Sequence, residues 1–195
     1  LSNWDTNQQI RLDGQWEFYP NVLLTPEMKL PEHKVYIDVP GTWDKQMGDQ
    51  SDGAGTYRLM IKLPQDALYG FKVKTMRFAS VIYANGHEIA HTGRIGYTKE
   101  TFRPESRYLF TSIGSKDGYI ELLIPMSSFN YYNGGIIKSI EFANYAAAQK
   151  SDYQNKIIET VFITLYLVFG LTFIFYFIKR KENRYYLYYG LSFLF

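Results

Sequence analysis

The sequence VFITLYLVFGLTFIFYFI, from Val161 to Ile178, contains no charged residue in eighteen positions. Together with residues 157–160 it forms a largely apolar segment of 22 residues. At about 1.5 Å of rise per residue, a helix of this length measures roughly 33 Å, which is enough to cross a hydrocarbon core of about 30 Å. A helix in a soluble protein normally has a polar face, and this segment has none. The segment therefore predicts a transmembrane helix over residues 157–178.

The charges that flank this segment predict its orientation. Four basic residues follow it closely, with a single acid among them: Lys179, Arg180, Lys181 and Arg184. The residues before the segment show no such excess of positive charge. Lysine and arginine beside a span favour the cytoplasmic side of a membrane. We therefore expect a cytoplasmic turn over residues 179–184, and an extracellular location at the cell membrane for the chain before residue 156.

A second aromatic segment follows the basic turn. Residues 185–195 read YYLYYGLSFLF and carry no charge, but they are about half as long as a membrane helix. We interpret them as the start of a second span, and the alternative is an aromatic belt at the membrane surface. Before the first span, residues 146–156 begin with three alanines among polar neighbours. This composition predicts a connector, or a short helix, that leads into the membrane.

The composition of the first 150 residues restricts their partners. They contain 16 basic and 16 acidic residues, so their net charge is zero. Nucleic-acid binding requires a concentrated basic surface, and we therefore expect no nucleic-acid partner. The chain has no cysteine, which excludes disulfides and thiolate metal sites. We expect no cofactor, and we expect the lipid bilayer to be one partner of the chain.

Alternating apolar and polar residues predict strands throughout residues 1–145. The alternation recurs in short segments bounded by proline or glycine: 16–18, 35–39, 57–63, 78–83, 119–124 and 136–142. The dipeptide Asn85-Gly86 favours a type I′ hairpin turn, because both central residues of that turn have positive φ. No convincing helix pattern precedes residue 145. The sequence predicts a mainly β protein, an antiparallel β-sandwich or jelly roll, followed by a transmembrane α-helix.

Several short motifs in the predicted strands resemble a known pattern. They are LDGQWEF at 12–18, VPGTW at 39–43, GAGTYR at 53–58, ASVIYANG at 79–86 and HTG at 91–93. Their order resembles the galactose-binding-like jelly roll that serves as the sugar-binding domain of family-two glycoside hydrolases. These motifs are mostly structural, so they indicate a fold and do not identify a ligand.

When these motifs are considered together with the membrane segments and the turn KRKENRYYLYYG at 179–190, the chain is more similar to another group. That group is the bacterial seven-transmembrane receptors with diverse intracellular signalling modules (7TMR-DISM), whose extracellular region includes such a jelly roll. The resemblance implies an extracellular sensor domain. It also implies five or more further spans and a cytoplasmic output domain, such as a kinase, cyclase or phosphatase, beyond residue 195.

Two segments without alternation are candidate binding sites. The first, residues 94–108, combines guanidinium groups, an aromatic ring and a carboxylate that would suit a sugar or an anion: Arg94, Tyr97, Arg103, Glu105 and Arg107. The alternative is a solvated loop whose arginine stems cover the edge of the core. The second, residues 129–135, is an aromatic and polar loop with Asn130, Tyr131 and Tyr132. Its alternative is a loop with its aromatic rings packed underneath.

The sequence offers little support for catalysis. His87 and His91 are four residues apart, but in a hairpin this spacing does not bring two ligands to one metal. The acidic residues are scattered, whereas a glycosidase requires two carboxylates in one cleft. We therefore expect a non-catalytic sensor domain that binds a small ligand such as a carbohydrate and transmits the event to the membrane helices. The alternative is a membrane-anchored module for protein–protein interaction, or for formation of a homodimer.

Overall fold

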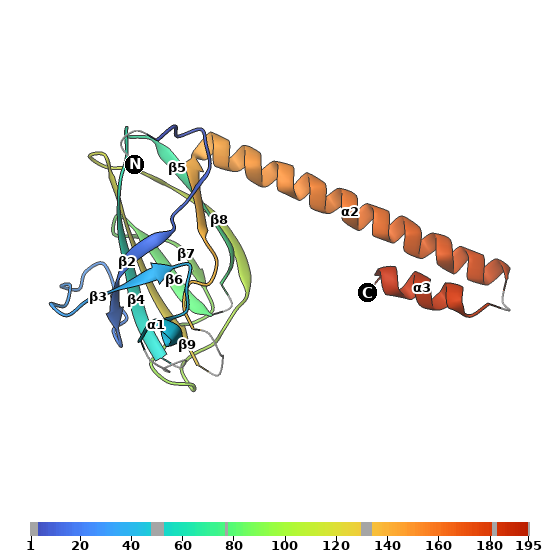
Figure 1. Ribbon diagram of the computed structural model, residues 1–195, viewed down its shortest axis with the longest axis horizontal. Helices are drawn as coiled ribbons and strands as arrows, with labels where there is room; N and C mark the ends of the chain where they lie inside the picture. Colours follow the sequence, from blue (N-terminus) through green and yellow to red (C-terminus); the bar gives the residue numbers. More distant parts are fainter. Residues whose placement is uncertain (1–3, 48–52, 77, 130–133, 181–182, 195) are drawn as a thin grey trace. The chain divides into compact units, whose positions relative to one another are not determined.

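The computed structural model describes residues 4–47, 53–76, 78–129, 134–180 and 183–194. The chain divides into two compact units, Leu1–Gln149 and Lys150–Phe195. The first unit consists mainly of strands and the second of helices (Figure 1). The expected order of a β domain followed by a long apolar helix is therefore confirmed.

The described part of the first unit contains ten strands in two antiparallel sheets. The six-stranded sheet has the order β3-β2-β4-β9-β6-β7 and the four-stranded sheet has the order β1-β10-β5-β8. The strands are β1 (Ile10–Arg11), β2 (Gly14–Pro20), β3 (Val35–Val39), β4 (Gly53–Lys62), β5 (Leu68–Met76), β6 (Ala79–Ala84), β7 (His87–Thr92), β8 (Arg107–Gly114), β9 (Tyr119–Ser128) and β10 (Ile140–Asn144). One short helix, α1 (Trp43–Met47), lies between β3 and β4.

The core lies between the two sheets and is rich in aromatic rings. The alternation in β2 and β4 turns Trp16, Phe18 and Tyr57 inward, where each is at most 1% exposed. From the four-stranded sheet, Tyr69 and Phe142 stack with ring centroids 5.1 Å apart. Burial of such large side chains is the main source of stability in a domain of this size. The prediction of a mainly β, sandwich-like domain is confirmed.

Some predicted boundaries differ from the structure. The expected strand over 136–142 is wrong at its start, because β10 begins at Ile140. The Ile136 N–H donates to the Tyr57 hydroxyl (3.3 Å) and the Ile136 C=O accepts from Gly41 N–H (2.8 Å). The polar groups of Ile136 therefore bond to loop and side-chain partners outside any strand ladder. The expected turn at Asn85-Gly86 is confirmed, with φ values of 49° and 81°.

The segment 94–108 was expected to lie outside the alternating strands, and its last two residues differ from this expectation. Arg107 and Tyr108 begin β8, where Arg107 is paired with Met76 of β5. Helix α1 is a second difference, because no helix was expected before residue 145. Its five residues are too few to show an apolar periodicity in the sequence.

The last strand of the sandwich leads directly into the long helix α2 (Tyr145–Lys179). The Asn144 side-chain oxygen accepts a hydrogen bond from Ala146 N–H (3.1 Å), which caps the start of the helix. The Tyr145 ring stacks on Phe110 of β8 with centroids 6.1 Å apart. Ala148 is buried so closely over Gly70 that a Cβ atom added there would lie 2.6 Å from the Ala148 Cβ. The first turn of α2 is thus seated on the outer face of the four-stranded sheet.

The second unit is a helical hairpin made of α2 from Lys150 onward and α3 (Tyr185–Leu194). The rings of Phe173 and Phe193 stack with centroids 5.9 Å apart, and a Cβ atom added to Gly190 would lie 2.7 Å from Ile174 Cγ1. Small residues permit this close approach of two helices. Among the described helices, α2 is the one that is long and apolar enough to cross a membrane.

Threonines inside α2 need no partner outside the helix. The hydroxyls of Thr160, Thr164 and Thr172 each donate to the main-chain carbonyl four residues earlier, at distances of 2.7–2.8 Å. A polar side chain satisfied in this way is compatible with hydrocarbon surroundings. The threonines therefore do not conflict with the predicted transmembrane helix.

Candidate functional site

The first predicted binding segment forms an ordered hairpin between β7 and β8. Arg94 and Arg103 are joined as an antiparallel bridge, with main-chain hydrogen bonds of 2.8 and 3.0 Å in the two directions. Gly93, with a φ of 58°, begins the hairpin, and its N–H donates to a Glu105 carboxylate oxygen (3.1 Å). The structure therefore brings Arg94, Arg103 and Glu105 close together.

Most of the predicted ligand-binding side chains in this hairpin bond to the chain itself. Arg94 Nε donates to the Thr101 carbonyl (3.0 Å), and Arg103 Nη1 donates to the carbonyl of the preceding residue (2.9 Å). The Tyr97 hydroxyl accepts a hydrogen bond from Leu23 N–H (2.9 Å). Arg107 lies apart from the hairpin loop, exposed at the start of β8. The second predicted segment is not placed, since Asn130, Tyr131 and Tyr132 lie outside the described residues, as does Lys181.

A buried serine of β9 anchors the hairpin to the six-stranded sheet. Ser127 Oγ accepts a hydrogen bond from Gly96 N–H (3.0 Å) and donates one to the Gly96 carbonyl (2.8 Å). Nearby, Phe102 is buried and packs edge-on against Phe129, with centroids 5.6 Å apart. These contacts make the hairpin a fixed part of the sandwich.

A second region, on the outer face of the six-stranded sheet, was not recognised in the sequence. The strand register places five side chains in one row across β3, β2, β4, β9 and β6: Tyr36, Glu17, Arg58, Leu123 and Tyr83. Residues that pair directly on neighbouring strands share one face of a sheet. The row therefore joins two aromatic rings, a leucine and a central pair of opposite charges on one surface.

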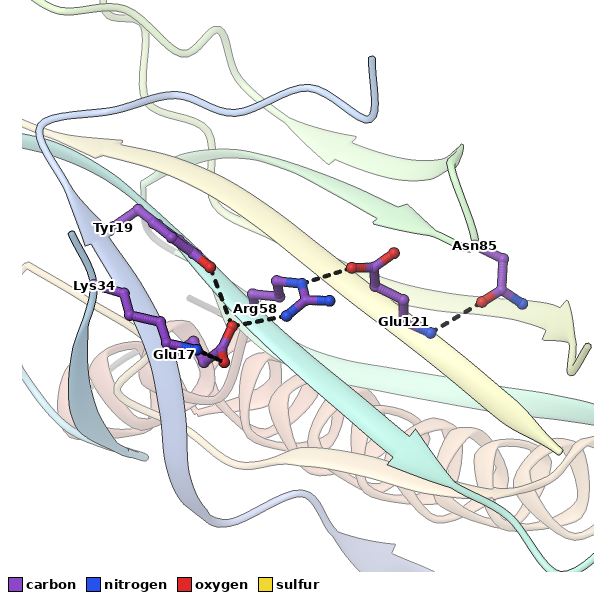
Figure 2. A network of polar contacts seen from close by, with 6 residues as sticks. All are labelled: Glu17, Tyr19, Lys34, Arg58, Asn85 and Glu121. Carbon is purple, nitrogen blue, oxygen red and sulfur yellow. Dashed lines mark hydrogen bonds and ion pairs between the residues drawn. The ribbon is translucent and has the colours of Figure 1, made fainter. Parts of the chain in front are cut away.

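The charged centre of this row is a connected network of side chains (Figure 2). Arg58 donates from Nη1 to Glu17 Oε2 (2.8 Å) and from Nε to Glu121 Oε1 (2.6 Å). Glu17 also accepts hydrogen bonds from the Lys34 ammonium and from the Tyr19 hydroxyl. Bonds of this kind, between ionised partners, are stronger than neutral hydrogen bonds. The network ties β2, β4 and β9 together on their outer face.

The network changes the ionisation of its central carboxylate. Burial raises the pKa of the Glu17 carboxyl, but hydrogen bonds from Lys34, Arg58 and Tyr19 outweigh it, so this pKa lies below its usual value of 4.5. Burial and the Glu17 charge raise the pKa of Tyr19. At neutral pH the network therefore consists of two carboxylates and two cations, with Tyr19 as a hydrogen-bond donor.

A small cavity lies at the end of the row that is formed by Leu123 and Tyr83. Its volume is about 200 Å³, and its lining includes Thr25, Met28, Leu30, Tyr83, Glu121 and Leu123. The hairpin turn after β6 fixes one side, because Asn85 exchanges hydrogen bonds with the main chain of Glu121: its N–H donates to the carbonyl (3.0 Å), and its side-chain oxygen accepts from the N–H (2.9 Å). Figure 2 shows this turn beside the Glu121 side chain. The arrangement places apolar, aromatic and charged groups around one hollow.

Comparison with known proteins identifies the fold of the first unit. No protein-family model matches the sequence, and no curated protein matches it. Among solved structures, a family GH2 β-galacturonidase from Eisenbergiella tayi, bound to galacturonate, has a TM-score of 0.50 with 12% identity over 70% of this chain. The β-glucuronidase of Faecalibacterium prausnitzii has a TM-score of 0.51 with 14% identity over 69% of this chain.

A third similar structure is the β-glucuronidase of Ruminococcus gnavus in complex with D-glucuronic acid, with a TM-score of 0.51 and 16% identity over 69% of this chain. The present chain covers only 24%, 31% and 29% of these three proteins, in the order given. At such identities the likeness shows a shared fold, which is a β-sandwich of the kind found in family GH2 glycosidases.

Ser127→Ala is expected to lower the free energy of unfolding by about 1–3 kcal/mol, because both main-chain groups of Gly96 lose their buried partner. Amide exchange in residues 94–103 should become faster. Ser128→Ala is the matched control: its hydroxyl is also fully buried but has no hydrogen-bond partner in the described part of the chain. Chemical unfolding of both variants measures the difference, and equal losses would contradict the anchoring role of Ser127.

Glu17→Gln is expected to lower the free energy of unfolding at pH 7 by about 1–3 kcal/mol, because Arg58 and Lys34 lose their shared charged partner. The folded-state pKa of Glu17 is depressed, so its stabilisation is complete above pH 4.5 and is lost as the pH falls through the folded-state value. The difference between wild type and variant should therefore shrink below pH 4.5.

Chemical unfolding of the full chain at pH 7 and at several lower pH values measures this difference. Asp13→Asn removes an exposed carboxylate just before β2 and serves as the control, with little expected effect at any pH. A loss of stability in Glu17→Gln that stayed constant down to about pH 3 would show that the carboxylate charge is not the stabilising feature.

Proposed function

We propose that this chain is the sensory and first membrane portion of a bacterial receptor. In this proposal the sandwich is a galactose-binding-like jelly roll that lies outside the cell and binds a small carbohydrate. The observation that supports it is the junction at Asn144, where the last strand becomes the long apolar helix without an intervening loop. A binding event that moves strands of the four-stranded sheet would then act directly on the start of α2.

Carbohydrate binding is supported by the fold and by the chemistry of the outer face. The three similar structures are glycosidases, and the two described as complexes contain galacturonate and D-glucuronic acid. In the present chain, Tyr36 and Tyr83 offer ring faces on which the apolar face of a sugar can stack. Two of the strands between them in the sheet, β4 and β9, carry Arg58 and Glu121, whose remaining hydrogen-bonding groups can bond to sugar hydroxyls.

We propose a binding role rather than a catalytic one. Both acids of the network, Glu17 and Glu121, accept charged hydrogen bonds from Arg58. The hydrogen bonds to Glu17 hold the pKa of its carboxyl below its usual value, whereas a glycosidase keeps one of its two carboxyl groups protonated as the general acid. Any enzymatic output of the proposed 7TMR-DISM receptor would belong to a separate domain.

The proposed membrane orientation depends on the basic turn after α2. With Lys179, Arg180 and Arg184 in the cytoplasm, the C-terminal end of α2 would face the cytoplasm and its N-terminal end would lie outside the cell. The chain contains no cysteine, so a single introduced cysteine is a specific probe of sidedness. Glu32 and Asn183 are exposed positions before and after α2 that suit such a substitution.

In spheroplasts that contain the full chain, a membrane-impermeant maleimide is expected to label Glu32→Cys directly. The same reagent is expected to label Asn183→Cys only after the membrane is permeabilised, because the positive charge beside it favours the cytoplasm. The cysteine-free chain is the control for background labelling. Labelling of Asn183→Cys in intact spheroplasts, with Glu32→Cys protected, would overturn the proposed orientation.

Sugar binding is expected to be detectable with the full chain in lipid nanodiscs. Saturation-transfer NMR with a panel of neutral, amine-bearing and acidic monosaccharides should show transfer to at least one sugar, with empty nanodiscs as the control. A folded chain, verified by a cooperative thermal unfolding transition, that gave no transfer to any sugar would contradict the proposed carbohydrate-binding function.

A further inference from the structure

The cavity between the segment 25–30 and strands β6 and β9 has a surface suited to a ring-shaped ligand. Tyr83 and Leu123 are paired residues on β6 and β9, so they lie side by side on the face of the sheet. Met28 and Leu30 contribute apolar groups from the segment that covers this face. A sugar ring has an apolar face and a polar edge, and this lining provides a surface for that face.

The size of the cavity limits what it can hold. Its volume of about 200 Å³ is below the roughly 300–1,000 Å³ that accommodates a drug-sized ligand. One sugar ring therefore fits better than a longer chain of sugars. Glu121 is the one charged side chain in the lining, and it is 40% exposed. The polar edge of a bound ring would meet this carboxylate.

The cations near Glu121 are already paired. Arg58 donates to both Glu121 and Glu17, and the Lys34 ammonium bonds to Glu17. The two carboxylates and two cations of the network therefore balance one another. Because the Arg58 nitrogens are directed at these carboxylates, they are poorly placed to bind an additional anion in the cavity. The network is therefore neutral overall, and a charge preference at the cavity depends on the charged groups outside it.

Two further carboxylates act on Tyr83, and one of them, Glu88, is its direct partner across β6 and β7. Burial raises the pKa of Tyr83, and the charges of Glu88 and Glu27 raise it further. Glu27 is held in its ionised form by the Thr25 hydroxyl, which lowers its pKa. Glu88 lies 2.8 Å from His91 Nδ1, on the exposed side of β7. A positive group in the cavity would be attracted by Glu121, Glu27 and Glu88. The exposed Lys29 of the covering segment opposes them with a single positive charge.

We propose that this cavity binds a single sugar ring that carries a free amine, with the ring face against Tyr83 and Leu123 and the ammonium group at the Glu121 carboxylate. This inference rests on the proposed carbohydrate-binding function and adds the location of the site and the charge of its ligand. The apolar lining recognises the ring, and the carboxylates discriminate between sugars by charge.

Three sugars with the same ring test this inference. Glucosamine is a cation near neutral pH, glucose is neutral and glucuronic acid is an anion. With the full chain in lipid nanodiscs, calorimetric titration is expected to show the tightest binding for glucosamine and the weakest for glucuronic acid. The preference for glucosamine over glucose should be about threefold or more, which corresponds to one exposed charged contact.

Variants of the lining separate ring binding from charge selection. Glu121→Gln should reduce the preference for glucosamine while glucose binding remains, and Tyr83→Ala should weaken the binding of all three sugars several-fold. Glu32→Gln is the control, because it removes one exposed carboxylate from the segment between β2 and β3 but does not line the cavity. If Glu121→Gln impairs folding, the double variant Glu27→Gln/Glu88→Gln, which leaves the network intact, should lower the preference instead.

The outcomes distinguish this inference from the function on which it rests. Tightest binding of glucuronic acid, or a preference for glucosamine that survives both Glu121→Gln and the double variant, would overturn the proposed site while carbohydrate binding stands. Sugar binding unchanged by Tyr83→Ala would overturn it as well. Absence of binding for all three sugars and for the wider panel would overturn the proposed function itself.

Discussion

β4 and β9 pair through ten consecutive residues, from Gly53 opposite Ser128 to Lys62 opposite Tyr119. This register determines which side chains enter the core and which reach the outer face. It turns Tyr57 inward and leaves Arg58 between the carboxylates of its two neighbouring strands. A shift of one residue would bury the guanidinium and expose the tyrosine, so the hydrophobic core and the polar network enforce the same pairing. The cavity and the anchored hairpin both depend on β9 lying in this register.

The covering segment after β2 is held by bonds from two distant parts of the chain. The Thr56 hydroxyl of β4 accepts from Leu24 N–H (2.9 Å) and donates to the Val22 carbonyl (2.6 Å). The Tyr97 hydroxyl accepts from Leu23 N–H. Tyr97, which the sequence predicts as a ligand-binding residue, therefore connects the hairpin between β7 and β8 to the segment that forms one side of the cavity.

The alternation of apolar residues was sufficient to predict the inward side chains of β2 and β4 and the turn at Asn85-Gly86, because those signals are local. The polar network has no local signal, since Arg58 is 41 residues from Glu17 and 63 residues from Glu121. Each of the three resembles an ordinary outward residue of a strand, and only the strand order brings them together. The hairpin arginines show the converse case. Their composition indicated a ligand, but sequence alone does not reveal that Arg94 bonds to a carbonyl of its own loop.

The start of α2 has little freedom to move independently of the sheet that precedes it. β10 remains paired with β5 up to Asn144, opposite Tyr69, and the next residue already belongs to the helix. Beside this joint, Glu141 lies 2.6 Å from Lys74 Nζ and 3.6 Å from Lys72 Nζ, and both Glu141 and Lys72 are buried. Separation of a buried ion pair leaves uncompensated charge and costs several kcal/mol, so β5 and β10 resist sliding past each other. Displacement of these strands as a unit therefore changes the position of the first helical turn, whereas a flexible linker would absorb it.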